Sequence, residues 1–307
     1  MLSRKPWLPL ILLRLPALSQ PVNPDPLLSR SEIAEIQVFE KKMGFQETKN
    51  FRTESARQHA YFLCYSTGLL QLPDSYEGLR LTPATEAGCR INGRKRDLFF
   101  YSVEALAGKA RITPSLIEAS DERKAVVVVH EDFHSMMREA PAPIAEAATT
   151  LVGFLTAAEF ARDRFGEGSD LHRNLSQEAE LFLRKADLVR AYHSRLRLLY
   201  TSVRQGGMSA AAALGAKQQI FEELGRSCRE ISPEPRSFNR CPPVLNNAGL
   251  AFDMTYADYY PLVYQMYLAQ DRNLKQTVER LKQLATNRAS GLRNSLQEPT
   301  RQPEPRP

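Results

Sequence analysis

The chain has 307 residues, of which 43% are hydrophobic and 25% are charged, so it can bury a full core and has an ordinary globular composition. Its formal net charge of +6 lies mostly at the two ends. The first 20 residues carry three basic side chains and no acidic one, and the tail from Asn287 carries four arginines against two glutamates. The body is close to neutral, which argues against a nucleic-acid-binding face.

The N-terminal segment MLSRKPWLPLILLRLPALSQ has the order of a secretory signal: a short basic region, an apolar stretch and small residues. We therefore expect residues 1–19 to be a signal peptide removed before Gln20, and the protein to be periplasmic or secreted. A disordered start or a misplaced initiation codon would instead leave it cytoplasmic. Arg14 interrupts the apolar stretch, which is too short to span a bilayer, and no other segment comes near that length. We predict no stable membrane span.

A linker over residues 20–28 is expected to lead into a helix. Ser29 and Glu32 form a capping box, and apolar residues then recur at helical spacing up to Met43. Two aromatic and β-branched runs follow, HAYFLCYS and DLFFYSVEAL, separated by turn residues that include Asn92–Gly93. These runs predict a small antiparallel sheet.

Almost everything after Pro114 has the pattern of helices. Apolar residues recur from Leu171 to Tyr200 as in one long amphipathic helix, which the segment RQGG ends. A second helix should place four apolar side chains on one face: Leu214, Phe221, Leu224 and Cys228. Together the two helices predict an antiparallel hairpin over about 170–229. The basic side chains of this hairpin are expected to form a solvated face: Arg184, Lys185, Arg190, Arg195 and Arg197.

Two more helices are expected after Pro242–Pro243, over about 245–269 and 272–286, and the proline-rich tail 287–307 should be disordered. The sequence thus predicts a mainly α protein of the α+β class, with one domain over residues 29–286.

The chain has four cysteines, Cys64, Cys89, Cys228 and Cys241, whose spacing fits no C-x-x-C metal motif. Disulfides are compatible with export, and Cys228 with Cys241, on either side of a proline-rich connection, is the preferred pair. Four separate thiols remain the alternative.

The segment HEDFH places His130 and His134 four residues apart, with Glu131 between them. On a helix both histidines project from one face and can bind one metal ion, while Glu131 lies close enough to act on a water molecule at that ion. Catalytic zinc needs a third protein ligand and an open position. The pattern also occurs by chance, as two polar residues on one helix.

Glu146 is the preferred third ligand. Pro141 and Pro143 should end the histidine helix and reverse the chain, so that a helix starting at Ile144 presents Glu146 in its first turn. The alternative is that Glu146 only complements the helix dipole. Glu139 should project elsewhere, and Glu159 is more than three turns further on.

These segments resemble those of a bacterial family of predicted zinc-dependent aminopeptidases, which carry H-E-x-x-H followed by an N-E-x-x-A/T helix. The matching segments here are HEDFH and AEAATTLVG, and the segment beginning VLNNAGLAFDMTYADYYP resembles a later block of the family. The resemblance covers about Asp97 to Ala285.

The resemblance implies a zincin-like peptidase domain of the glutamate-ligand type, with one zinc ion per chain and a peptide as substrate. His130, His134 and Glu146 would be the ligands and Glu131 the general base. The chain departs from the family pattern at Ala145, where Asn is usual.

The later block offers three further candidates. Tyr256 could donate to an oxyanion, and Asn246 and Asn247 could bind the substrate backbone. Aromatic packing and helix capping are the competing structural explanations. The remaining histidines are expected to be surface or structural residues: His59, His172 and His193.

Two other functions remain open on the sequence alone. The same residues could hydrolyse a non-peptide amide or ester. The protein could also be a helical envelope protein without catalysis, in which zinc is structural or absent. The sequence does not determine an oligomeric state.

Overall fold

The computed structural model describes residues 30–55, 58–91, 93–106, 108, 110–241 and 244–286. The expected signal peptide, the linker, Ser29 of the capping box, Asn92 and the tail from residue 287 lie outside these residues.

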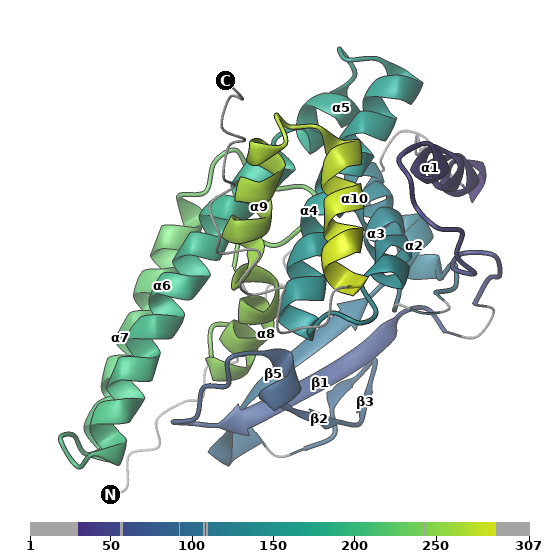
Figure 1. Cartoon of the computed structure of the whole chain (residues 1–307). Coiled ribbons are helices and arrows are strands. Elements are labelled where there is room, and N and C mark those ends of the chain that lie inside the picture. Colours follow the sequence, from purple (N-terminus) through teal and green to yellow (C-terminus); the bar gives the residue numbers. More distant parts are fainter. Residues whose placement is uncertain are drawn as a thin grey trace, which may run out of the picture.

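A small antiparallel sheet lies at the bottom of Figure 1, with the helices above it and to one side. Its middle strand is β1 (Tyr61–Gly68), which pairs with β2 (Arg80–Thr82) on one side and β5 (Arg96–Val103) on the other. The β1–β5 register runs from Tyr61 opposite Val103 to Gly68 opposite Arg96. The sheet predicted from the two aromatic runs is confirmed.

Short elements extend the sheet region. The 3-10 helix η1 (Tyr76–Gly78) lies between β1 and β2, and η2 (Gly93–Lys95) precedes β5. The strands β3 (Ala84–Thr85) and β4 (Gly88–Cys89) form a two-residue ladder, and a Cys64–Cys89 disulfide links β4 to β1.

The HEDFH segment lies in α3 and η3, within the first group of helices. In chain order they are α1 (Arg30–Lys42), α2 (Pro114–Glu118), α3 (Asp121–Phe133), the 3-10 turn η3 (His134–Met136) and α4 (Ala142–Phe165). The Ser120 side chain caps α3 by accepting from the Arg123 amide. The four valines of α3 are all buried, so core packing outweighs the strand preference of β-branched residues.

The expectation that no other segment approaches membrane length is corrected by α4. This helix is long and apolar enough to cross a bilayer, but 89% of its most apolar window is buried inside the protein. Its apolar character is explained by its central position, where it contacts α3, α5, α8 and α9.

The hairpin region differs from the prediction at two points. The expected single helix from Leu171 is divided into α5 (Asp170–Leu175) and α6 (Glu178–Arg204), where the Ser176 hydroxyl donates to the Arg173 carbonyl in place of a regular helical bond. The second helix, α7 (Ala210–Arg229), lies alongside α6 at the left of Figure 1. Leu214 is exposed rather than on the packed face of α7.

The expected helix over 245–269 is also divided, into α8 (Asn247–Ala257) and α9 (Tyr260–Ala269). Pro261 explains the break, because it lacks an amide hydrogen and is tolerated only in the first turn of a helix. The last helix is α10 (Leu274–Thr286). A second disulfide joins Cys228 to Cys241, as preferred from the sequence.

Candidate metal and active site

The two motif histidines come from adjacent turns at the end of α3. His130 lies in the last turn of the α-helix, and His134 begins the 3-10 turn that continues it. Their Nε2 atoms are 3.1 Å apart, and both side chains are partly buried. The four-residue spacing therefore directs both imidazoles to one point.

Glu146 reaches the same point from α4. The chain turns back through residues 137–141, and the Glu146 Oε2 atom lies 3.2 Å from Nε2 of His130 and 3.3 Å from Nε2 of His134. Glu146 is in the second turn of α4, not the first as expected, because Pro143 is accommodated at the helix start and α4 begins at Ala142. An acid in this position does not cap the helix, so helix-dipole complementarity does not explain it.

The three donor atoms lie close to the spacing that a metal ion requires. Ligand atoms about 2.0–2.2 Å from a tetrahedral zinc ion lie about 3.3–3.6 Å from one another. The Nε2 and Oε2 atoms of this group are 3.1–3.3 Å apart. The buried Oε2 atom makes these two ion-pair contacts but has no hydrogen bond of good geometry with a described residue. The donor set of two imidazoles and one carboxylate thus fits zinc.

The charges at the site favour the ionised carboxylate of Glu146, which is the form that binds a metal ion. Burial alone would raise the pKa of Glu146, but the two neighbouring histidines hold it well below its ordinary value. Burial lowers the pKa of His130, so this imidazole tends to be neutral and able to coordinate.

The family of the protein follows from a comparison with known families. Residues 111–296 match the family described as "Putative aminopeptidase", and this match covers more than half of the chain. The chain belongs to this family. No curated protein and no solved structure gives a significant match.

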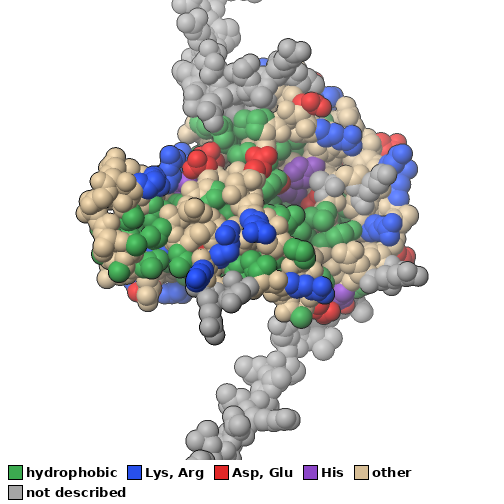
Figure 2. Space-filling model, turned by 90° about the horizontal axis from the view of Figure 1, so that it is seen from below, with side chains coloured by type: hydrophobic (Ala, Val, Ile, Leu, Met, Phe, Trp, Pro, Cys, Tyr) green, Lys and Arg blue, Asp and Glu red, His purple; other side chains and the backbone are tan. Residues whose placement is uncertain are grey.

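The site of this aminopeptidase family member opens into a cavity of about 1030 Å³. The cavity is lined by residues of the sheet, α3, α4, α6, α8 and the segment 234–240. Figure 2 shows histidine side chains between hydrophobic and acidic side chains on one face of the protein. The residues that carry the three donor atoms therefore line a cavity of the size of a small-molecule site.

Glu131 lies next to His130 in sequence but is not one of the three residues whose donor atoms converge. It lines the cavity, and its buried Oε2 atom has no hydrogen-bond partner among the described residues. Burial raises the pKa of Glu131 to about 7. A carboxyl group with a pKa near neutrality and an uncommitted oxygen is suited to accept and donate a proton.

Two tyrosines complete this end of the cavity. The Tyr256 ring from α8 stacks on His130 with 6.3 Å between ring centroids, and its hydroxyl forms no hydrogen bond to a described residue. The Tyr76 hydroxyl donates to Oε1 of Glu146 at 3.1 Å. Sequence analysis missed Tyr76, which lies in η1 before the family match begins.

Asp132, which does not line the cavity, holds α3 against α1 and the segment that follows α1. Its carboxylate accepts hydrogen bonds from Gln37 on α1 and from Thr48 and Asn50 in the following segment. The Asn50 side chain also donates to the Glu131 carbonyl at 3.0 Å. These contacts anchor the helix turn that carries the HEDFH segment.

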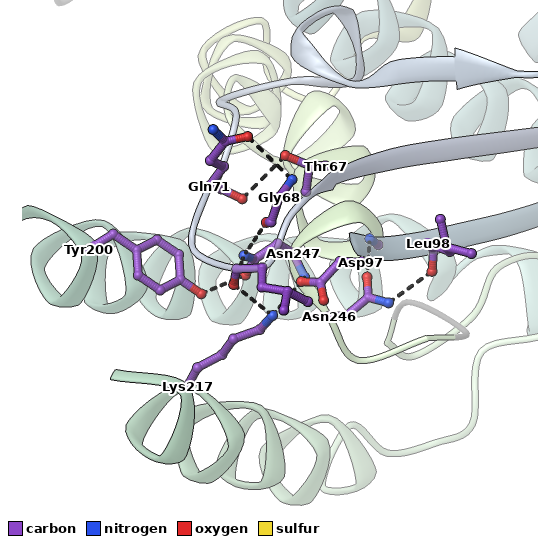
Figure 3. A network of polar contacts seen from close by, with 11 residues as sticks. Thr67, Gly68, Gln71, Asp97, Leu98, Tyr200, Lys217, Asn246 and Asn247 are labelled. Carbon is purple, nitrogen blue, oxygen red and sulfur yellow. Dashed lines mark hydrogen bonds and ion pairs between the residues drawn. The ribbon is translucent and has the colours of Figure 1, made fainter. Parts of the chain in front are cut away.

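Asn246 and Asn247 do not line the cavity, and their contacts are structural. Asn246 caps α8 by accepting from the Gly249 amide and donates to the Leu98 carbonyl. Figure 3 shows Asn247 in a polar network that holds the α6–α7 hairpin against the sheet. The buried Asn247 accepts from Tyr200 and donates to the Leu69 carbonyl. This arrangement corrects the expected substrate contact.

The other expectations for polar residues have mixed outcomes. His59 is exposed and His172 bonds the Glu167 carbonyl, while the buried His193 bonds the Pro73 carbonyl, so none of the three lines the cavity. Lys185 corrects the expected solvated face, because it is buried and paired with Asp253 in the cavity wall.

Proposed function

We propose that the protein is a zinc-dependent metallopeptidase of the glutamate-ligand type, with His130, His134 and Glu146 as zinc ligands. The observation that carries the proposal is the convergence of the three donor atoms to 3.1–3.3 Å at the wall of a substrate-sized cavity. Family membership supports peptide hydrolysis and, more narrowly, aminopeptidase activity. The fold would then be a zincin-like one.

A zinc ion at this site supplies Lewis acidity, which polarises the scissile carbonyl and makes water more acidic. Glu131 takes the proton of the attacking water on its free carboxylate oxygen and delivers it to the leaving amine. Tyr256, which lines the cavity and whose hydroxyl has no described partner, donates a hydrogen bond to the oxyanion that develops on the carbonyl. Tyr76 keeps the Glu146 carboxylate in place.

The proposed location is the periplasm or the exterior of the cell. The two disulfides support this location, because disulfides persist in oxidising compartments and are rare in the cytosol.

The decisive experiment replaces the proposed base, Glu131, and leaves the three proposed zinc ligands unchanged. Glu131→Gln should retain zinc, measured by metal analysis, while peptide hydrolysis falls by a factor of about 100 to 10,000. Hydrolysis at the parent rate would remove Glu131 from the mechanism. A parent protein that contains well below one zinc ion per chain after purification with zinc would contradict the proposed function itself.

A further inference from the structure

A buried ion pair lies in the cavity wall away from the metal ligands. The Lys185 ammonium from α6 is 2.9 Å from the Asp253 carboxylate from α8, and the two side chains are 6% and 11% exposed. The ammonium also lies 5.6 Å from the Phe182 ring centroid and 5.8 Å from that of Phe238. Because a buried ion pair contributes little more stability than apolar residues of similar size, its place in this wall points to a role in binding.

The pair has unused hydrogen-bonding capacity. An ammonium group has three donors and a carboxylate has about four acceptor positions. Lys185 and Asp253 contact each other, and neither has another polar partner among the described residues. The 2.9 Å contact is an ion pair without good hydrogen-bond geometry at the Asp253 Oδ2 atom. Donors and acceptors therefore remain for a molecule in the cavity.

The pair lies within reach of a peptide bound at the proposed metal ligands. Asp253 and Tyr256 lie one turn apart on α8 and both line the cavity, and the Tyr256 ring centroid is 6.3 Å from that of His130. Side chains one helical turn apart are separated by about 5–6 Å, so the two steps together cover about 12 Å. An extended peptide rises about 3.3 Å per residue, so the pair lies within about four residues of the proposed ligands.

The nearest other charges in this part of the wall are also paired. Arg123 binds Glu104 through two nitrogens, at 3.0 and 2.8 Å, and donates to the Ser237 carbonyl at 2.9 Å. Three further charged residues line the cavity from the segment 234–240: Glu234, Arg236 and Arg240. These are exposed or partly exposed, so water and salt screen them.

We propose that Lys185 and Asp253 form a substrate subsite that accepts an uncharged polar residue and rejects residues of either charge. The inference rests on the proposed peptidase function. A charged side chain here meets one attractive and one repulsive partner in a partly buried setting, so the two interactions nearly cancel. The cost of removing that charge from water remains. An amide offers a donor and an acceptor together, and it can bond both partners without separating them.

The test uses peptides that are identical except for one position, occupied by Gln, Lys or Glu, scanned through four residues on each side of the cleaved bond. At the position that fills the subsite, the parent enzyme should cleave the Gln peptide at least about tenfold better in kcat/KM than both charged peptides, equal to about 1.4 kcal/mol. A parent preference for either charge at every scanned position would overturn the proposal.

Single variants should shift selectivity in opposite directions. Lys185→Gln leaves the Asp253 carboxylate alone and should favour the Lys peptide, whereas Asp253→Asn should favour the Glu peptide. The double variant should prefer the Gln peptide again. Arg195→Gln serves as a control on the same helix, because Arg195 pairs with Glu223 outside the cavity. If the single variants do not fold, the parent measurement still decides the proposal.

Failure of this inference differs from failure of the proposed function. Single variants that hold zinc and cleave the Gln peptide, with unchanged selectivity among charged peptides, would remove the subsite and leave the peptidase assignment intact. Binding of the same peptides to zinc-loaded Glu131→Gln, measured by calorimetry, gives a readout without turnover. Equal affinity for the Gln, Lys and Glu peptides would also overturn the subsite.

Discussion

Tyr76 in η1 donates a 3.1 Å hydrogen bond to Oε1 of Glu146 in α4, across 70 residues of sequence. The other carboxylate oxygen, Oε2, faces the two histidines. Tyr76 is itself held by α8, where the Thr255 hydroxyl accepts from the Tyr76 backbone amide at 2.8 Å. The sheet region, which precedes the family match, thus orients Glu146, the proposed metal ligand, which lies within the match.

Tyr76→Phe should lower zinc affinity by about 10- to 100-fold, because partners that orient a metal ligand typically contribute that much. The measurement is a competition titration with a chelator of known affinity. Tyr65→Phe is the matched control: the Tyr65 ring packs 6.3 Å from that of Tyr76 but has no hydrogen bond to Glu146. Equal losses in the two variants would show that aromatic packing, not the hydrogen bond, sets the affinity.

Glu146→Ala should abolish zinc binding at micromolar metal, because it removes one of three protein ligands. Two acids near Glu146 in sequence provide controls. Glu139 is exposed in the connection before α4, and Glu159 pairs with Arg162 at the other end of that helix. Metal analysis of Glu139→Ala and Glu159→Ala should return the parent content. Zinc retained by Glu146→Ala would require another third ligand.

The convergence of His130, His134 and Glu146 was predictable because its geometry is mostly local. Four-residue spacing places His130 and His134 on one side of a helix end, and the prolines that follow require a turn before Glu146. The sheet was predictable for the same reason, since two aromatic runs pair as adjacent antiparallel strands.

Contacts between distant segments were not predictable. Nothing in the residues around Tyr76 indicates that η1 lies over α4, and Lys185 follows the same pattern as the solvated arginines of α6. Asn247 was assigned to substrate from its place in a motif, whereas the structure uses it to join α8, α6 and the end of β1. In each case burial by another element decides the role of the side chain.

Lys217 on α7 offers a direct measure of what holds the hairpin to the sheet. Its ammonium binds the buried Asp97 carboxylate and the Leu69 carbonyl (Figure 3). Lys217→Met should lower the free energy of unfolding by about 3–5 kcal/mol, because it leaves the Asp97 charge buried without its counterion. Urea unfolding followed by circular dichroism gives this value.

Arg195→Met is the control for Lys217→Met on the neighbouring helix. Arg195 and Glu223 form an exposed ion pair, so the free energy of unfolding should change by no more than about 1 kcal/mol. A similar loss of unfolding free energy in both variants would mean that the buried Lys217–Asp97 pair stabilises the fold no more than the exposed pair does.

Glu40 on α1 should make stability depend on pH. Burial and the nearby Asp132 carboxylate raise the pKa of Glu40 well above its ordinary value, so the folded protein binds this proton more tightly than the unfolded chain. This contribution to the free energy of unfolding is therefore full below about pH 4.5 and is lost as the pH rises through the raised pKa of Glu40 in the folded protein.

Glu40→Gln, which carries no charge, should be more stable than the parent at pH 8 and close to it at pH 4. Glu35→Gln, at an exposed ion pair of the same helix, should show no such pH-dependent difference in thermal unfolding. A Glu40→Gln protein whose stability differs from the parent by the same amount at both pH values would show that Glu40 does not titrate in this range.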